Sequence, residues 1–136
     1  MTRSEARKNV LELLFEREFR QDETDEEIFS LSCEAREIEV DEYIKSSYFG
    51  VCKNIEALDK EIDKNAKGWK AARLSKISRS ILRLCIYEML YVEDIPCLAS
   101  INEAIEFAKL YEDEKARPFI NGVLNAVKNN AEVKES

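Results

Sequence analysis

The chain has 136 residues, 45% of them hydrophobic and 36% charged, and a formal net charge of −7. This length suits one domain with one main core, and only three glycines and two prolines favour helices over a turn-rich sheet protein. No apolar run approaches the length of a membrane span or a secretory signal, so we expect a cytoplasmic protein.

The first forty residues predict two helices. Residues 4–21 show apolar side chains at helical spacing, which indicates an amphipathic helix. Thr24 and Glu27 fit a capping box, in which each side chain accepts a hydrogen bond from the other residue's backbone N–H. This box would start a second, shorter helix that runs to about Arg36.

A third, long helix is expected to follow. Asp41 suits its N-cap, and an apolar stripe with steps of three and four continues from Ile44 to Ile62. Gly50 lies inside this stripe, where a missing side chain would allow close packing.

The second half predicts three more helices after a connector at residues 65–74. The first starts at Ser75 or Lys76 and ends before Pro96, which disfavours helix at the residue preceding it. Residues 100–103 fit another capping box, and the pair at 117–118 suits the start of the last helix. Gly122 would let a neighbouring helix approach, and residues 131–136 read as a disordered tail.

Together these patterns predict an all-α protein, because no segment alternates as a strand does. We expect a single domain of two small helical bundles with about six or seven helices. The N-terminal bundle would span about residues 1–64 and the C-terminal bundle about 75–130, with the join near 64–74.

The reactive side chains argue against several classes of site. The chain has no histidine, its four cysteines are widely spaced, and there is no CxxC, so neither a metal site nor a cofactor is expected. We interpret the cysteines as reduced thiols, most of them buried. An enzyme is disfavoured, because a Gly-rich phosphate loop and a nucleophile motif are also missing.

Charge is distributed unevenly along the chain. Residues 12–42 carry thirteen acids and three bases, whereas residues 60–83 carry eight bases and two acids. Residues 1–10 add three bases against one acid. Taken alone, the negative net charge argues against nucleic-acid binding, but it conceals two basic segments.

Three linked motifs stand in the second half of the chain: RSILRLCIYE at residues 79–88, Pro96 followed by SINEAIEFAK at 100–109, and FINGVLN at 119–125. They resemble the NusB family of transcription antitermination factors. The first is similar to that family's "lR-a-yE" helix, the second to its "vP…iNEAvelAK" segment and the third to its "fvNgvLd" segment. Their order and spacing agree, and the opening helix fits more weakly, so the resemblance covers nearly the whole chain.

The resemblance implies an all-helical fold of two small bundles without catalytic activity. Members pair with a small-subunit ribosomal protein, called NusE in this role, and the pair binds a boxA element in nascent RNA. The complex makes RNA polymerase resist termination, chiefly on ribosomal RNA operons. The chain departs from the family in a thinner N-terminal basic cluster and in the residues at 112–117.

Five residues are RNA-contact candidates. A helix N-terminus favours anions, so three bases there are better explained by phosphate contacts, although a solvated helix start fits as well. In the family an aromatic at the position of Phe119 contacts RNA, where a base can stack on the ring, but a phenylalanine closing the core is the alternative. The candidates are Arg3, Arg7, Lys8, Arg117 and Phe119.

The resemblance also implies two partner contacts, Phe15 and Glu88. An exposed carboxylate at Glu88 would pair with a basic protein and orient it. A basic face at residues 73–83 is a further RNA candidate; its alternative is a solvated surface, with Arg83 paired internally. A helical protein-binding module without RNA binding remains the second hypothesis, and both a monomer and a homodimer fit the fold.

Overall fold

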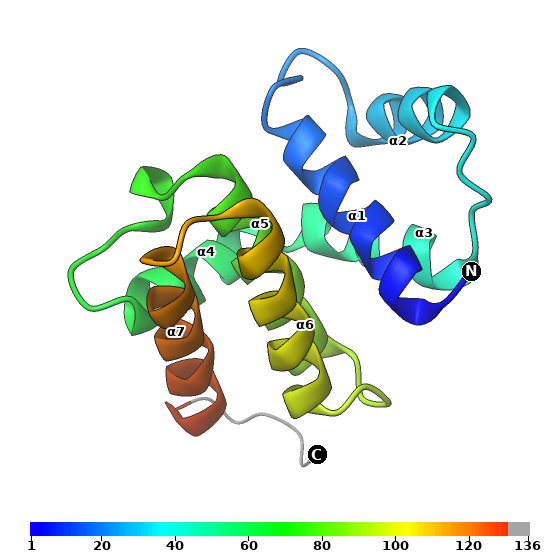
Figure 1. Ribbon diagram of the computed structural model, residues 1–136. Helices are drawn as coiled ribbons and strands as arrows, with labels where there is room; N and C mark the ends of the chain where they lie inside the picture. Colours follow the sequence, from blue (N-terminus) through cyan, green and yellow to red (C-terminus); the bar gives the residue numbers. More distant parts are fainter. Residues whose placement is uncertain (131–136) are drawn as a thin grey trace.

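The structure, a computed structural model, describes residues 1–130 and contains seven α-helices and no strand in that range (Figure 1). The predicted all-α fold and helix number are therefore confirmed. The tail predicted at 131–136 lies outside the described residues. The elements are α1 (Arg3–Arg17), α2 (Asp25–Ala35), α3 (Glu42–Lys53), α4 (Ile55–Asn65), the 3₁₀ turn η1 (Ala71–Arg73), α5 (Lys76–Tyr91), α6 (Cys97–Tyr111) and α7 (Ala116–Asn130).

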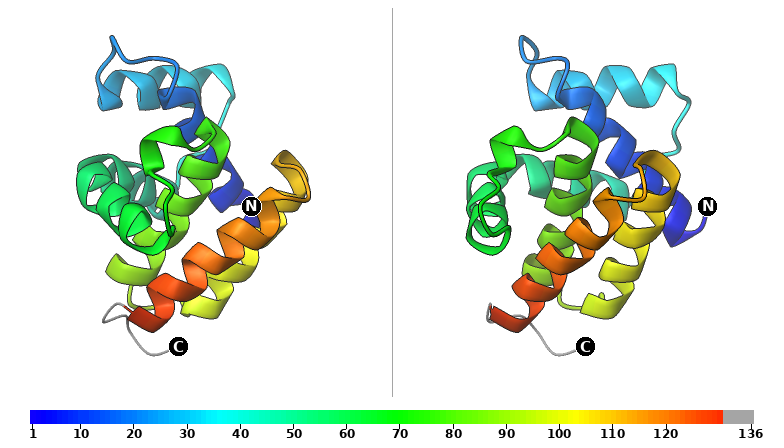
Figure 2. Two further views of the ribbon diagram at one scale, coloured as in Figure 1. Left: turned by 90° about the vertical axis from the view of Figure 1, so that its left-hand side faces the viewer. Right: turned by 60° about the vertical axis from the view of Figure 1, so that its left-hand side comes forward.

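Helix α5 is the central element. It contacts α1 and α3 on one side and α4, α6 and α7 on the other, and α6 lies beside α7 in both views of Figure 2. Apolar residues surround much of α5, so most of its length is buried. Helices α1 to α3 form the first group, and α4 contacts α5 and α7 more extensively than it contacts α3.

The helix starts follow the predicted caps in the first half. Thr24 and Glu27 form the expected capping box at α2, and the carboxylate of Asp41 accepts from the backbone N–H of Ile44 at 2.8 Å. A further capping box, formed by Thr2 and Glu5, begins α1. Each box satisfies backbone donors that a helix leaves without partners.

The expected long third helix is wrong, because the chain breaks at Asn54 into α3 and α4. The side-chain amide of Asn54 donates to the carbonyl of Gly50 at 2.7 Å, competing with the helical hydrogen-bond pattern. Both helices still bury the same apolar stripe, with Val51 and Leu58 fully buried on either side of the break. The continuous apolar stripe in the sequence therefore gave no indication that the helix breaks at Asn54.

The expected capping box at residues 100–103 is also wrong. Helix α6 begins earlier, at Cys97, directly after Pro96. Ser100 is consequently inside the first turn, and its hydroxyl donates to Glu88 at 2.7 Å instead of capping the helix. Glu103 accepts from Ser4 and Arg7 of α1. These motif residues join helices rather than start one.

No disulfide links the four cysteines, all of which lie within the described residues. Cys33, Cys85 and Cys97 are buried, as predicted. Cys52 is partly buried, and burial with the charge of Asp25 raises the pKa of its thiol to about 12. At neutral pH this thiol stays protonated and is a poor nucleophile. None of the helices described is long and apolar enough to cross a membrane.

The two helical glycines differ in their surroundings. Gly50 of α3 faces the ring of Tyr87, and a Cβ there would overlap the phenol oxygen. The expected close packing at Gly50 is therefore confirmed. A Cβ at Gly122 of α7 would have no neighbouring atom within 4 Å among the described residues, so the close approach expected there is wrong.

These surroundings give opposite predictions for the same substitution. We expect Gly50→Ala to lower the free energy of unfolding by about 1–3 kcal/mol, because the packed Tyr87 ring must move. Gly122→Ala is the matched control and should raise it by up to about 1 kcal/mol, since alanine is the better helix former. Urea unfolding followed by circular dichroism measures both. Equal effects of the two substitutions would contradict this packing.

Candidate nucleic-acid and partner interface

The first turns of α1 separate the three predicted N-terminal bases. Arg3 and Lys8 are exposed, whereas Arg7 is only 5% exposed and points into the protein. The guanidinium of Arg3 lies 4.2 Å from the ring centroid of Tyr43, a cation–π contact that keeps it at the surface of α3. Of the three, only Arg3 and Lys8 are therefore exposed to solvent.

Arg7 forms a buried ion pair with Glu88. Its Nε donates to Oε2 of Glu88 at 2.9 Å, and its Nη1 donates to Glu103 at 2.8 Å. Burial opposes the charge of Arg7, but the hydrogen bond and negative charge of Glu88 outweigh it and raise the pKa of Arg7 above its ordinary value. The guanidinium therefore stays charged inside the protein.

Glu88 of α5 receives donors from three other helices. Besides Arg7 of α1, the phenol of Tyr43 on α3 donates to Oε2, and the hydroxyl of Ser100 on α6 donates to Oε1. Burial and the charge of Glu88 raise the pKa of Tyr43, so its phenol keeps the proton that it donates. Glu88 is thus the meeting point of α1, α3, α5 and α6.

The expectation of an exposed carboxylate at Glu88 is wrong, because this residue is 0% exposed. The sequence held a signal for its burial. Glu88 follows Leu84 by four residues and Ile81 by seven, so it belongs to the buried stripe of α5. The charge type suggested a surface residue, whereas its position on the helix indicated the core.

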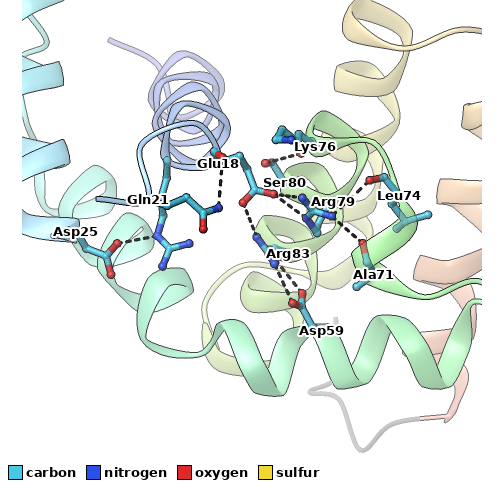
Figure 3. A network of polar contacts seen from close by, with 11 residues as sticks. Glu18, Gln21, Asp25, Asp59, Ala71, Leu74, Lys76, Arg79, Ser80 and Arg83 are labelled. Atoms are coloured by element: carbon cyan, nitrogen blue, oxygen red, sulfur yellow. Dashed lines mark hydrogen bonds and ion pairs between the residues drawn. The ribbon is translucent and has the colours of Figure 1, made fainter. Parts of the chain in front are cut away.

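A second ion-pair network lies at the other end of α1 (Figure 3). Glu18 accepts from Nε of Arg79 at 2.6 Å and lies 3.5 Å from Nη1 of Arg83. Arg83 also makes two bonds of 2.8 Å to the carboxylate of Asp59 on α4. Arg83 is thus paired internally, which was the alternative to an RNA contact, and the basic face at 73–83 is reduced to Arg73 and Lys76, which remain exposed.

The remaining RNA candidates lie at the start of α7. Asp113 caps this helix by accepting from the backbone N–H groups of Lys115 and Ala116, each at 3.1 Å. Phe119 is half-buried and packs edge to face against Trp69, with 6.1 Å between the ring centroids. Within residues 1–130, Nε of Arg117 is buried without a hydrogen-bond partner.

Three grooves contain candidate residues from the two groups. Lys8 lines a groove of about 430 Å³ that reaches Lys109 and Leu110 at the end of α6, and Arg3 lines another of about 460 Å³ on the far side of Ser4 and Glu103. A third groove, of about 450 Å³, begins at Glu112 and contains Phe119. The structure thus places the two groups of candidates in separate grooves rather than in one pocket.

The predicted partner residue Phe15 lies elsewhere on α1. Its ring is half-buried and meets Phe19 edge to face, with centroids 5.1 Å apart. Phe19 is 62% exposed, and the ammonium of Lys76 lies 5.3 Å from its ring centroid. Sequence reasoning did not single out Phe19 or Trp69 for a site, although both are large apolar side chains in loop segments.

The buried position of Glu88 gives a stability prediction. Glu88→Gln removes the charge opposite Arg7, so we expect the free energy of unfolding to fall by about 3 kcal/mol or more. Glu106→Gln on the exposed surface of α6, where the carboxylate meets Lys109, should cost less than about 1 kcal/mol. Urea unfolding compares the two. A loss for Glu88→Gln as small as that for Glu106→Gln would show that the buried pair contributes little.

Comparison with known proteins agrees with this geometry. The sequence matches the NusB family over residues 4–129. It is 44% identical over 128 residues to transcription antitermination protein NusB of Ruminiclostridium cellulolyticum, an alignment that covers 93% of this chain and 88% of the relative. The corresponding protein of Listeria monocytogenes is 42% identical over 124 residues, covering 91% and 94%.

Solved structures share the fold. NusB of T. maritima superposes with a TM-score of 0.82 at 32% identity, covering 96% of this chain and 92% of that one. A crystal structure of antitermination factors NusB and NusE in complex with double-stranded RNA contains a chain with a TM-score of 0.82 at 28% identity, covering 95% and 98%. With the three sequence motifs now placed in one helical fold, this chain belongs to the NusB family.

Proposed function

We propose that this protein is a transcription antitermination factor that binds boxA RNA together with a NusE-type small-subunit ribosomal protein and promotes ribosomal RNA transcription. The proposal rests on the similarity of this chain, over nearly its full length, to antitermination proteins. It rests also on the fold that this chain shares with a chain in a complex of NusB, NusE and RNA. The protein acts without catalysing a reaction, in the bacterial cytoplasm, as part of the RNA polymerase antitermination complex.

The surface supports a division of roles among the candidate residues. Arg3, Lys8 and Arg117 supply positive charge for phosphates, and Phe119 offers a ring for a base. Phe15 contributes to the partner surface. Arg7 and Glu88 act indirectly, because their buried pair fixes α1 against α5 and so sets where Arg3 and Lys8 stand.

The charge of the protein favours a shared RNA site. A net charge of −7 repels a polyanion, and only a few exposed bases line the grooves beside α1 and α6. A basic partner would add phosphate contacts and reduce this repulsion. We therefore expect weak binding of boxA RNA by this protein alone and markedly tighter binding with the partner present.

This gives a test by salt dependence. The double variant Arg3→Ala, Lys8→Ala should bind boxA RNA more weakly in the presence of the partner. Its slope of log affinity against log salt should be smaller by about 1.4, because about 0.7 is lost for each contact to a single strand. Filter binding at several salt concentrations measures both quantities.

The matched control is Lys45→Ala, Lys53→Ala, two exposed lysines of α3 that line none of the three grooves. It should leave the slope unchanged. Equal slopes for all three proteins would remove Arg3 and Lys8 from the RNA site. If the parent protein binds the partner but no RNA, the alternative holds, namely a helical protein-binding module without RNA binding.

A further inference from the structure

The connector between α4 and α5 contains an unbalanced group of positive charges. Residues 64–87 include seven bases and no acid. Two of them, Arg79 and Arg83, are ion-paired inside the protein with Glu18 and Asp59. The other five are exposed, and no ion pair to them is found within residues 1–130: Lys64, Lys67, Lys70, Arg73 and Lys76.

An exposed tryptophan stands among these five cations. The backbone turns sharply before it, with φ of 34° at Lys67 and 90° at Gly68, and this turn brings Trp69 against Phe119 of α7. Trp69 is 54% exposed, so much of its indole faces solvent. An indole that only closed the core would be covered on both sides.

The two aromatic rings share one groove. Trp69 and Phe119 line the groove of about 450 Å³, together with Arg73 and Lys115. Its two acids are already engaged within the protein: Glu112 accepts from the hydroxyls of Ser75 and Ser78, and Asp113 caps α7. The groove therefore presents two rings and two cations to a ligand.

We propose that Trp69 is a second base-stacking position, so that single-stranded RNA continues from Phe119 across the basic surface of residues 64–76. Stacked bases on aromatic rings, with cations along the phosphates, are the features by which proteins bind single strands. A protein partner fits less well, because the centre of a protein interface is poor in lysine. This inference rests on the proposed function and extends its RNA site beyond the four contact residues assigned above.

Trp69 is the only tryptophan of the chain and therefore reports on its own site. Single-stranded RNA carrying boxA with unpaired flanks is titrated into the full chain while tryptophan fluorescence is recorded. Stacking should quench the fluorescence, with the same midpoint as binding measured by anisotropy of labelled RNA. Polyglutamate of equal charge should cause no such quenching.

Variants separate stacking from charge. Trp69→Ala should weaken RNA binding at least about fivefold with an unchanged salt slope, whereas Trp69→Phe should retain most of the affinity. Lys70→Ala, Arg73→Ala should lower the slope by about 1.4. The control Tyr91→Ala removes an exposed aromatic at the other end of α5 and should change neither quantity.

The outcomes distinguish this inference from the proposed function. If the parent binds RNA with its partner but shows no quenching, and Trp69→Ala binds as well as the parent, Trp69 has no place in the site although the proposed function stands. Quenching by polyglutamate at the same midpoint would mean that this surface takes an acidic protein. Failure of the parent to bind RNA at all, with the partner present, would overturn the proposed function and this inference together.

Discussion

The fold depends on two sets of ion pairs that fix α1 to α5, which we call the clamp. In one set α1 supplies the base and α5 the acid, and in the other α1 supplies the acid and α5 the bases. Arg7 near the start of α1 pairs with Glu88 near the end of α5, whereas Glu18 at the end of α1 pairs with Arg79 and Arg83 in the first half of α5. The helices therefore run antiparallel, and a shift of α1 by one turn would leave charges unpaired in the interior. Leaving a buried charge without its partner is costly, so these pairs specify the register as well as add stability.

This clamp also decides which charges reach the surface. The acidic segment at 12–42 and the basic segment at 60–83 suggested a strongly polarised molecule, but Glu18, Arg79 and Arg83 neutralise one another inside. The exposed bases that remain include two groups, Arg3 with Lys8 on α1 and the five cations around Trp69. Both groups stand on segments whose positions the clamp sets, since α1 carries the first and the connector into α5 carries the second.

Much of the fold could be predicted from the sequence, because helical periodicity and the Thr24 capping box are local signals. The break at Asn54 could not, since α3 and α4 bury one continuous stripe. For the site, motif residues such as Ser100 and Glu103 resembled a cap, but their hydrogen bonds lead to α5 and α1. Residue type alone also misplaced Glu88 and Arg7, because burial of a charge depends on which donors distant segments bring to it.

The most direct test of the clamp is a double-mutant cycle between Arg7 and Glu88. The variants Arg7→Met, Glu88→Met and their combination are compared with the parent by urea unfolding. If the burial of each charge depends on its pairing with the other, removing both should lower the free energy of unfolding by less than the sum of the two single losses. The difference should be about 1–3 kcal/mol. Losses that add to within about 0.5 kcal/mol would show that the two charges are not coupled and would contradict the central role of this pair.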